Sequence, residues 1–217
     1  MKNLEQLGWG NYKEHIEDTT SPNEIGRVRR VDRGEVDVLT TAGEIRAFSD
    51  SQRAKSITAP VTGDWVKTYG DPEQGYVIDT VLPRYSQIVR RDPAEMERPQ
   101  ILASNIDVVA IVLSADRPIN IARIERLLVL AATSPAEAAF ILTKSDFGIP
   151  TEWNELEQEF PNVHKIETSA LSSVGKPEIN RLLTPNQTVV LLGAVSYTHL
   201  RAHETVLDLV CRLLLEK

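Results

Sequence analysis

Four residues in the middle of the chain, Thr143, Lys144, Ser145 and Asp146, follow an apolar stretch and have the types needed to recognise a purine base. A carboxylate such as that of Asp146 can accept two adjacent N–H donors in one bidentate contact, which is among the stronger kinds of hydrogen bonding. Guanine presents such a pair at N1 and N2, and adenine does not. Sites built in this way discriminate by roughly 10⁴-fold, because the wrong base leaves the carboxylate unpaired.

A second run, Ser169, Ala170 and Leu171, follows one strand–helix unit later. We expect Ser169 and the backbone N–H of Ala170 to approach the same base from the other side, with Ala170 donating to guanine O6. Lys144 would lay its aliphatic stem along the base plane, and Thr143 would hold the loop by hydrogen bonding. The first run alone is equally compatible with a solvated turn capped by Asp146, but the second favours the nucleotide interpretation.

The composition indicates a soluble protein. Of the 217 residues 41% are apolar and 25% charged, and no stretch offers the roughly 18 apolar residues of a membrane span. The N-terminus lacks an apolar segment of signal-peptide length, which predicts a cytoplasmic protein. A single cysteine, Cys211, and four scattered histidines form no zinc motif. The net charge of −7 requires any contact with RNA to be local.

Residues 1–22 are polar and mixed, and we interpret them as an N-terminal extension. Residues 23–83 then alternate between apolar and polar positions in short runs separated by turn residues. Five short strands in about sixty residues, with a long connection between the third and fourth, predict a small OB-type barrel. The expected strands are Ile25–Val31, Glu35–Thr40, Glu44–Phe48, Asp64–Tyr69 and Tyr76–Leu82.

Barrels of this type often bind RNA through one face of the sheet. Residues 24–84 hold nine Lys or Arg against ten Asp or Glu, and the basic residues are concentrated at Arg27, Arg29, Arg30 and Arg33. Alternation places Arg27 and Arg29 on one face of a strand. This cluster is a candidate RNA-binding patch, and a solvated strand face explains it equally well.

The charged stretch 84–99 is expected to be a linker, and residues 100–193 alternate strands with helices. Asn120 is placed to cap a helix with apolar residues at helical spacing. The pattern predicts a mostly parallel sheet, whose ligands bind at the carboxyl ends of the strands. The expected strands are Val108–Leu113, Ala138–Leu142, Val163–Thr168 and Thr188–Leu192. The expected helices are Glu152–Phe160, Gly175–Leu183 and the one capped by Asn120, with apolar positions Ile121, Ile124, Leu127, Leu128 and Ala131.

An ordered set of motifs between residues 25 and 193 resembles the ribosome small subunit-dependent GTPase A family (RsgA, also called YjeQ). Besides the two runs above, the set comprises Val28–Gly34, Leu39-Thr40, Gly43–Ala47, Gly63–Val66, Leu82–Arg84, Arg90–Pro93, Leu102–Asp107, Arg123–Leu127 and Thr188–Gly193. The resemblance implies an OB barrel, a circularly permuted GTPase domain and a C-terminal zinc domain. It also implies GTP or GDP with Mg²⁺ as ligands, and the small ribosomal subunit with its rRNA as partner.

The resemblance stops at Gly193, which is the first glycine of the phosphate loop that the family's pattern implies. That loop needs glycine, lysine and a hydroxyl, but the corresponding residues here are Thr198, His199 and Leu200. Residues 194–217 are similar to translated sequencing-adaptor sequence, so we interpret them as a non-native tail. A genuine amphipathic C-terminal helix is the competing interpretation.

The predicted function is that of a GTPase assisting late maturation of the small ribosomal subunit, with this chain as a truncated and inactive piece. It would retain Thr143, Lys144, Ser145, Asp146, Ser169, Ala170, Leu171 and Gly193 as the GTP-binding residues. It would bind no cofactor tightly, contact no membrane and be a monomer. The alternative is an OB-fold rRNA-binding module with a non-catalytic α/β docking domain.

Overall fold

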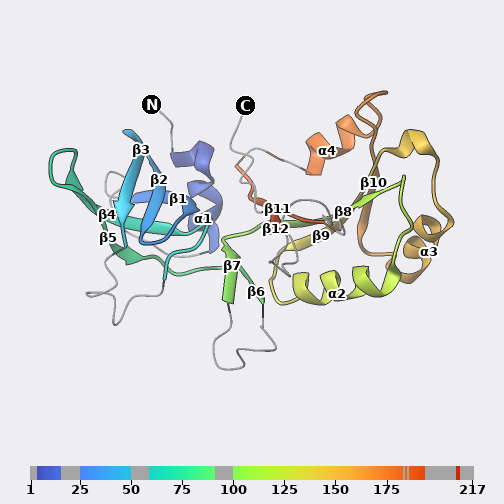
Figure 1. The fold of residues 1–217 in the computed structure, drawn as a ribbon, viewed down its shortest axis with the longest axis horizontal. Helices are drawn as coiled ribbons and strands as arrows, with labels where there is room; N and C mark the ends of the chain where they lie inside the picture. The colour runs from blue at the N-terminus through green and yellow to red at the C-terminus, as the bar shows by residue number, and fades with distance from the viewer. Residues whose placement is uncertain are drawn as a thin grey trace. The chain divides into compact units, whose positions relative to one another are not determined.

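The computed structural model describes residues 4–15, 25–49, 59–90, 100–182, 184, 186–193 and 209–210. The chain divides into two compact units, of which the first runs to Ile106 and also takes in Thr188, and the second begins at Asp107. Figure 1 shows a barrel in the first unit and a sheet with helices in the second.

Five strands close into a barrel in the first unit, in the order β1-β2-β3-β5-β4. All neighbours are antiparallel except β3 and β5. The inward positions of the alternating pattern form an apolar interior that includes Val28, Val38 and Val66. The predicted five-stranded barrel is confirmed, with strands β1 (Ile25–Val31), β2 (Glu35–Thr40), β3 (Gly43–Phe48), β4 (Trp65–Asp71) and β5 (Gly75–Val81).

The N-terminal segment is part of the first unit's core rather than the extension that the sequence predicted. A 3₁₀ helix, η1 (Leu4–Leu7), leads into α1 (Trp9–His15). The Trp9 ring stacks on Tyr12 with centroids 5.1 Å apart and meets Trp65 edge-on at 4.8 Å. These contacts bury Leu4, Leu7, Trp9 and Tyr12. The correction applies to residues 4–15, because the rest of 1–22 lies outside the described residues.

The predicted linker over 84–99 contains a strand. β6 (Gln87–Arg90) pairs antiparallel with β7 (Gln100–Ser104), and both belong to the first unit. Residues 91–99 lie outside the described part of the chain. The second unit therefore starts at Asp107, seven residues later than the predicted boundary at 100.

A buried ion pair joins Asp64 and Arg84 in the first unit. The Arg84 Nε and Nη2 atoms donate to the two carboxylate oxygens at 2.6 Å each, and Ser104 Oγ donates to Oδ1 at 2.5 Å. The Asp64 side chain is 0% exposed and that of Arg84 9%. Gly63 has φ +96°, and a Cβ there would collide with the carbonyl oxygen of Ser104. Only glycine permits this close approach of the two backbones.

Arg27 extends this polar network to the N-terminal segment and to Thr188. Its guanidinium donates to the carbonyl oxygens of Leu7 and Asn105 and to the Thr188 hydroxyl. It also lies over the Trp65 ring, 5.3 Å from the centroid. Arg27 is therefore buried and only 2% exposed, although arginine side chains are rarely buried in proteins.

The second unit is a sheet of five strands in the order β10-β9-β8-β11-β12. The first four are parallel, and β12 (Leu209–Val210) runs antiparallel to β11. The strands are β8 (Val108–Ser114), β9 (Glu137–Thr143), β10 (His164–Glu167) and β11 (Val189–Gly193). The predicted mostly parallel sheet is confirmed. Of the tail predicted over 194–217, the structure describes only the two residues of β12.

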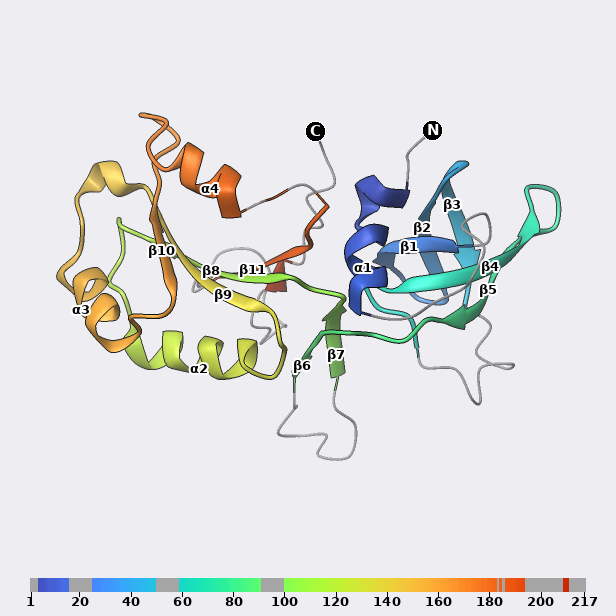
Figure 2. The same cartoon turned by 180° about the vertical axis from the view of Figure 1, so that it is seen from behind.

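Helices connect the parallel strands: α2 (Ile121–Ala131), α3 (Thr151–Glu159) and α4 (Lys176–Leu182). Figures 1 and 2 show α2 and α4 on opposite faces of the sheet. The predicted cap of α2 is present, because the Asn120 side chain accepts from the Arg123 N–H at 3.0 Å. Ile124 and Leu127 are buried on the helix face toward the sheet. No described helix is long and apolar enough to cross a bilayer.

The ion pair yields a prediction about stability. Asp64→Asn leaves the Arg84 guanidinium buried without its counter-charge, which should lower the free energy of unfolding by about 3 kcal/mol. Urea unfolding followed by tryptophan fluorescence reports on it, since Trp9 and Trp65 lie in the same unit. The control is Asp79→Asn at an exposed barrel position, which should change the free energy by less than about 0.5 kcal/mol. Equal effects of the two substitutions would contradict the role of the pair.

Candidate functional site

The four residues 143–146 comprise the last residue of β9, Thr143, and the start of the loop that follows. The Thr143 hydroxyl donates to the carbonyl oxygen of Leu113 at 2.8 Å and so ties the end of β9 to β8. Lys144 adopts the left-handed conformation at φ 57°, and Ser145–Phe147 form a short 3₁₀ helix, η4. The chain thus turns sharply at the carboxyl end of β9, and Asp146 is exposed there.

The loop after β10 begins at the same edge of the sheet. The Thr168 N–H donates to the Leu142 carbonyl at 2.8 Å, and the Ser145 N–H donates to the Thr168 carbonyl at 3.1 Å. These backbone bonds hold the two loops side by side. Gly175, at φ +76°, allows the second loop to turn back, because a Cβ there would collide with the Glu167 carbonyl oxygen.

A side-chain hydrogen bond joins the two predicted recognition runs. Ser169 Oγ donates to Asp146 Oδ1 at 2.5 Å and accepts from the Leu171 N–H at 3.2 Å. Ser169 is 2% exposed, whereas Ala170 and Leu171 are exposed. A carboxylate offers about four lone-pair positions, so Asp146 retains the capacity to accept a bidentate donor pair from a ligand. Among the described residues, its Oδ2 has no hydrogen-bond partner.

Lys144 is held by a carboxylate that the sequence analysis did not single out. Its Nζ lies 2.5 Å from Asp116 Oδ2, and Ser114 Oγ donates to Asp116 Oδ1. The hydrogen bond from Lys144, followed by that from Ser114, holds the pKa of the Asp116 carboxyl below its ordinary value. A lowered pKa means that the pair persists at neutral pH and is lost only as the pH falls through that lowered value.

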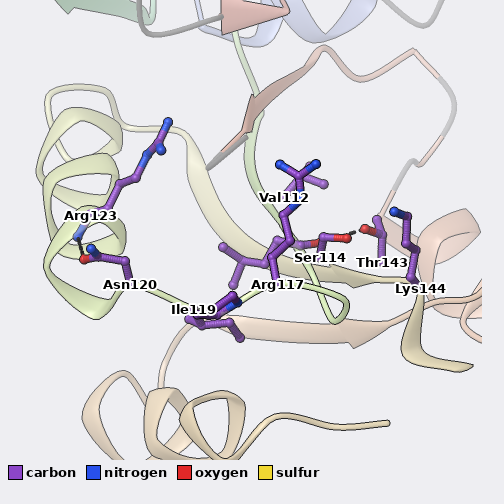
Figure 3. Close-up of a pocket in the computed structure, with 10 residues that line it drawn as sticks. Val112, Ser114, Arg117, Ile119, Asn120, Arg123, Thr143 and Lys144 are labelled. Atoms are coloured by element: carbon purple, nitrogen blue, oxygen red, sulfur yellow. Dashed lines mark hydrogen bonds between the residues drawn. The ribbon is translucent and has the colours of Figure 1, made fainter. Parts of the chain in front are cut away.

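A pocket of about 570 Å³ opens at the carboxyl ends of β8 and β9, next to the start of α2. Figure 3 shows Thr143 and Lys144 on one side of it and Asn120 and Arg123 on the other, with Arg117 between them. Val112 and Ile119 contribute apolar surface to the lining, and Asp146 and Ser169 are not part of it. The pocket and the run 143–146 thus share Thr143 and Lys144.

Gly193 ends β11 at the same edge of the sheet, paired with Val112 of β8. One strand, β8, therefore separates it from β9 and the loop of Asp146. Residues 194–208 lie outside the described residues. Within the described ranges, no group of three or more His, Cys, Asp or Glu is placed to hold a metal ion.

The four arginines of the basic cluster do not share one face. A bulge in β1 between Val28 and Arg30 interrupts the alternation that put Arg27 and Arg29 together. Arg27 is buried, as described above. Arg29 contacts both oxygens of Glu44 at 2.8 and 2.9 Å, and Arg30 pairs with Asp32 at 3.0 Å. The predicted shared face of Arg27 and Arg29 is wrong, and the exposed members are Arg29, Arg30 and Arg33.

Known proteins resemble this chain in both sequence and fold. The profile of the RsgA GTPase family matches residues 81–195. A protein of Syntrophotalea carbinolica named "Small ribosomal subunit biogenesis GTPase RsgA" is 32% identical over 206 residues, covering 88% of this chain and 57% of the relative. One of the same name from Streptomyces avermitilis is 34% identical over 177 residues, covering 77% and 46%. The chain thus spans about half the length of these relatives.

Two solved structures have the same architecture. "Crystal structure of YjeQ from Thermotoga maritima" matches with a TM-score of 0.62 at 22% identity, covering 78% of this chain and 60% of that one. "The crystal structure of YloQ, a circularly permuted GTPase" matches with a TM-score of 0.56 at 18% identity, covering 78% and 59%. Barrel and parallel sheet together thus define the fold of a circularly permuted GTPase preceded by a small barrel. The family match is more specific than the fold, and the chain belongs to the RsgA GTPase family.

The contact between the two loops can be tested by hydrogen exchange. Ser169→Ala removes the acceptor of the Leu171 N–H and the donor to Asp146, a change of about 1 kcal/mol per hydrogen bond. Amide exchange at Leu171, measured by NMR, should therefore accelerate about threefold to tenfold. The matched control is Ser172→Ala, an exposed position in the same loop, which should leave that rate unchanged. Equal rates in wild type and Ser169→Ala would remove Ser169 from the contact.

Proposed function

We propose that the loops 143–146 and 169–171 form the guanine-recognition part of a GTP-binding site. The observation that carries the proposal is the hydrogen bond from Ser169 to Asp146, which fixes the carboxylate at the edge where both loops begin. Asp146 accepts from guanine N1–H and N2–H2, and the exposed Ala170 N–H donates to O6. Lys144 lies along the base, and Thr143 anchors its loop to β8.

The whole protein, on this proposal, hydrolyses GTP with Mg²⁺ and assists biogenesis of the small ribosomal subunit. The names of the two relatives described above support this assignment. Gly193 begins the phosphate loop, and zinc is bound in a further domain. Among the described residues, no group of three or more His, Cys, Asp or Glu is placed to hold either metal. The 217-residue chain binds guanine nucleotide weakly and does not hydrolyse it, because phosphate contacts supply much of the affinity of such sites.

The barrel is proposed to contact rRNA of the small subunit through Arg29, Arg30 and Arg33. Arg33 is exposed in the turn between β1 and β2, and the ion pairs of the other two are solvent-exposed and individually weak. Arg27 is left out of this surface because it is buried. We further propose a cytoplasmic monomer.

A substitution that replaces one oxygen of the Asp146 carboxylate tests whether this side chain recognises guanine. Asp146→Asn replaces one acceptor oxygen by a donor, which suits the C2 carbonyl of xanthine instead of the C2 amine of guanine. The retained Oδ1 still accepts from Ser169, so the loop geometry should persist. Measured by NMR titration of the 217-residue chain, the ratio of GDP to XDP affinity should fall at least about tenfold.

The matched control for this experiment is Asp79→Asn in the barrel, which makes the same chemical change at an exposed position of the other unit. It should leave the preference for GDP as in the wild type. An unchanged ratio in Asp146→Asn would remove Asp146 from the base site.

A further inference from the structure

We infer that Asp116 is a positioning residue for the guanine site, which acts by holding Lys144 in the orientation that receives the base. This inference rests on the proposed function. Asp116 lies in the loop after β8, 28 residues before Lys144, and belongs to none of the motif runs that identify the site.

The geometry gives Asp116 two separate partners. One carboxylate oxygen, Oδ2, contacts Lys144 Nζ at 2.5 Å, and the other, Oδ1, accepts from the Ser114 hydroxyl. Ser114 is the last residue of β8 and is paired with Thr143 of β9. The Asp116 carboxylate is therefore held by Ser114 at the end of β8, and it in turn holds the Lys144 side chain, which follows the end of β9.

Lys144 benefits from such a partner because its side chain is long and half exposed. The residue is in the left-handed conformation at the start of η4, and its side chain is 52% exposed. A lysine side chain with four rotatable bonds loses up to about 2 kcal/mol of rotamer entropy when it is fixed. The ion pair with Asp116 restricts the Lys144 side chain before the base binds, so less rotamer entropy is lost on binding.

The position of the pair relative to the pocket supports a role in binding rather than in folding. Ser114, Thr143 and Lys144 all line the pocket, on the side that leads to the loop of Asp146. The Lys144 side chain is 52% exposed and that of Asp116 23%, and ion pairs this accessible to solvent contribute little to stability.

A double-mutant cycle on the 217-residue chain tests the inference. Guanosine and GDP are titrated by NMR into wild type, Asp116→Asn, Lys144→Met and the double variant. Lys144→Met keeps an apolar stem for the base and removes the ammonium. Asp116→Asn should weaken binding of both ligands about threefold to tenfold. In the Lys144→Met background the same substitution should change affinity less than about 1.5-fold, because its partner is gone.

Controls separate the possible outcomes. Glu159→Gln, at the end of α3 and outside the pocket lining, removes one exposed carboxylate elsewhere and should bind like the wild type. Wild-type affinity in Asp116→Asn, tighter binding, or an equal loss in both backgrounds overturns the inference while the base site stands. A wild-type chain that binds neither guanosine nor GDP refutes the proposed function itself. Should Asp116→Asn fail to fold, Ser114→Ala replaces it, and an unchanged affinity there also overturns the inference.

Discussion

Parallel pairing of β8, β9 and β10 is the constraint on which the candidate site depends. Ser114 pairs with Thr143 and Leu142 with Glu167, so three successive strands end at one edge within a residue or two of each other. A shift of one residue in either pair would displace the loop of one strand from that of its neighbour by about 3.3 Å, the rise of one residue in a parallel strand. The short contacts between the loops follow from this register.

The buried polar network of the first unit explains why much of the family resemblance involves residues remote from any nucleotide motif. Gly63 and Asp64, Arg84, and Ser104 with Asn105 come from three separate motifs, yet they contact one another around one carboxylate. Substitution of any of these residues would leave a buried polar group without its partner. This lowers the free energy of unfolding more than the loss of an exposed contact does. These residues stabilise the fold of the first unit through their buried contacts with one another.

Sequence patterns predicted the elements well and the long-range polar contacts poorly. The five barrel strands, the Asn120 cap and the strand leading to Asp146 followed from local alternation and helical spacing. The burial of Arg27 did not, because it depends on Leu7, Asn105 and Thr188, which are distant in the chain. The docking of α1 was missed for a related reason: Trp9 and Tyr12 are only two aromatic side chains in a polar segment, and their partner Trp65 lies more than fifty residues away. Asp116 escaped notice because a strand-end Ser-Ala-Asp is also an ordinary turn sequence.

The two predicted recognition runs precede Gly193 in the chain, yet all three lie at one edge of the sheet. This is possible because hydrogen-bond pairing, and not the order of strands along the chain, determines which strands are neighbours. β11 is the last of the four parallel strands in sequence, yet it pairs with β8, the first. Since it runs in the same direction as its neighbour, its carboxyl end at Gly193 must reach the edge where the loops of β9 and β10 begin. Gly193, the proposed start of the phosphate loop, therefore lies at the same edge of the sheet as the loops after β9 and β10. Circular permutation changes which connections the chain makes and leaves the parallel pairing of the strands intact.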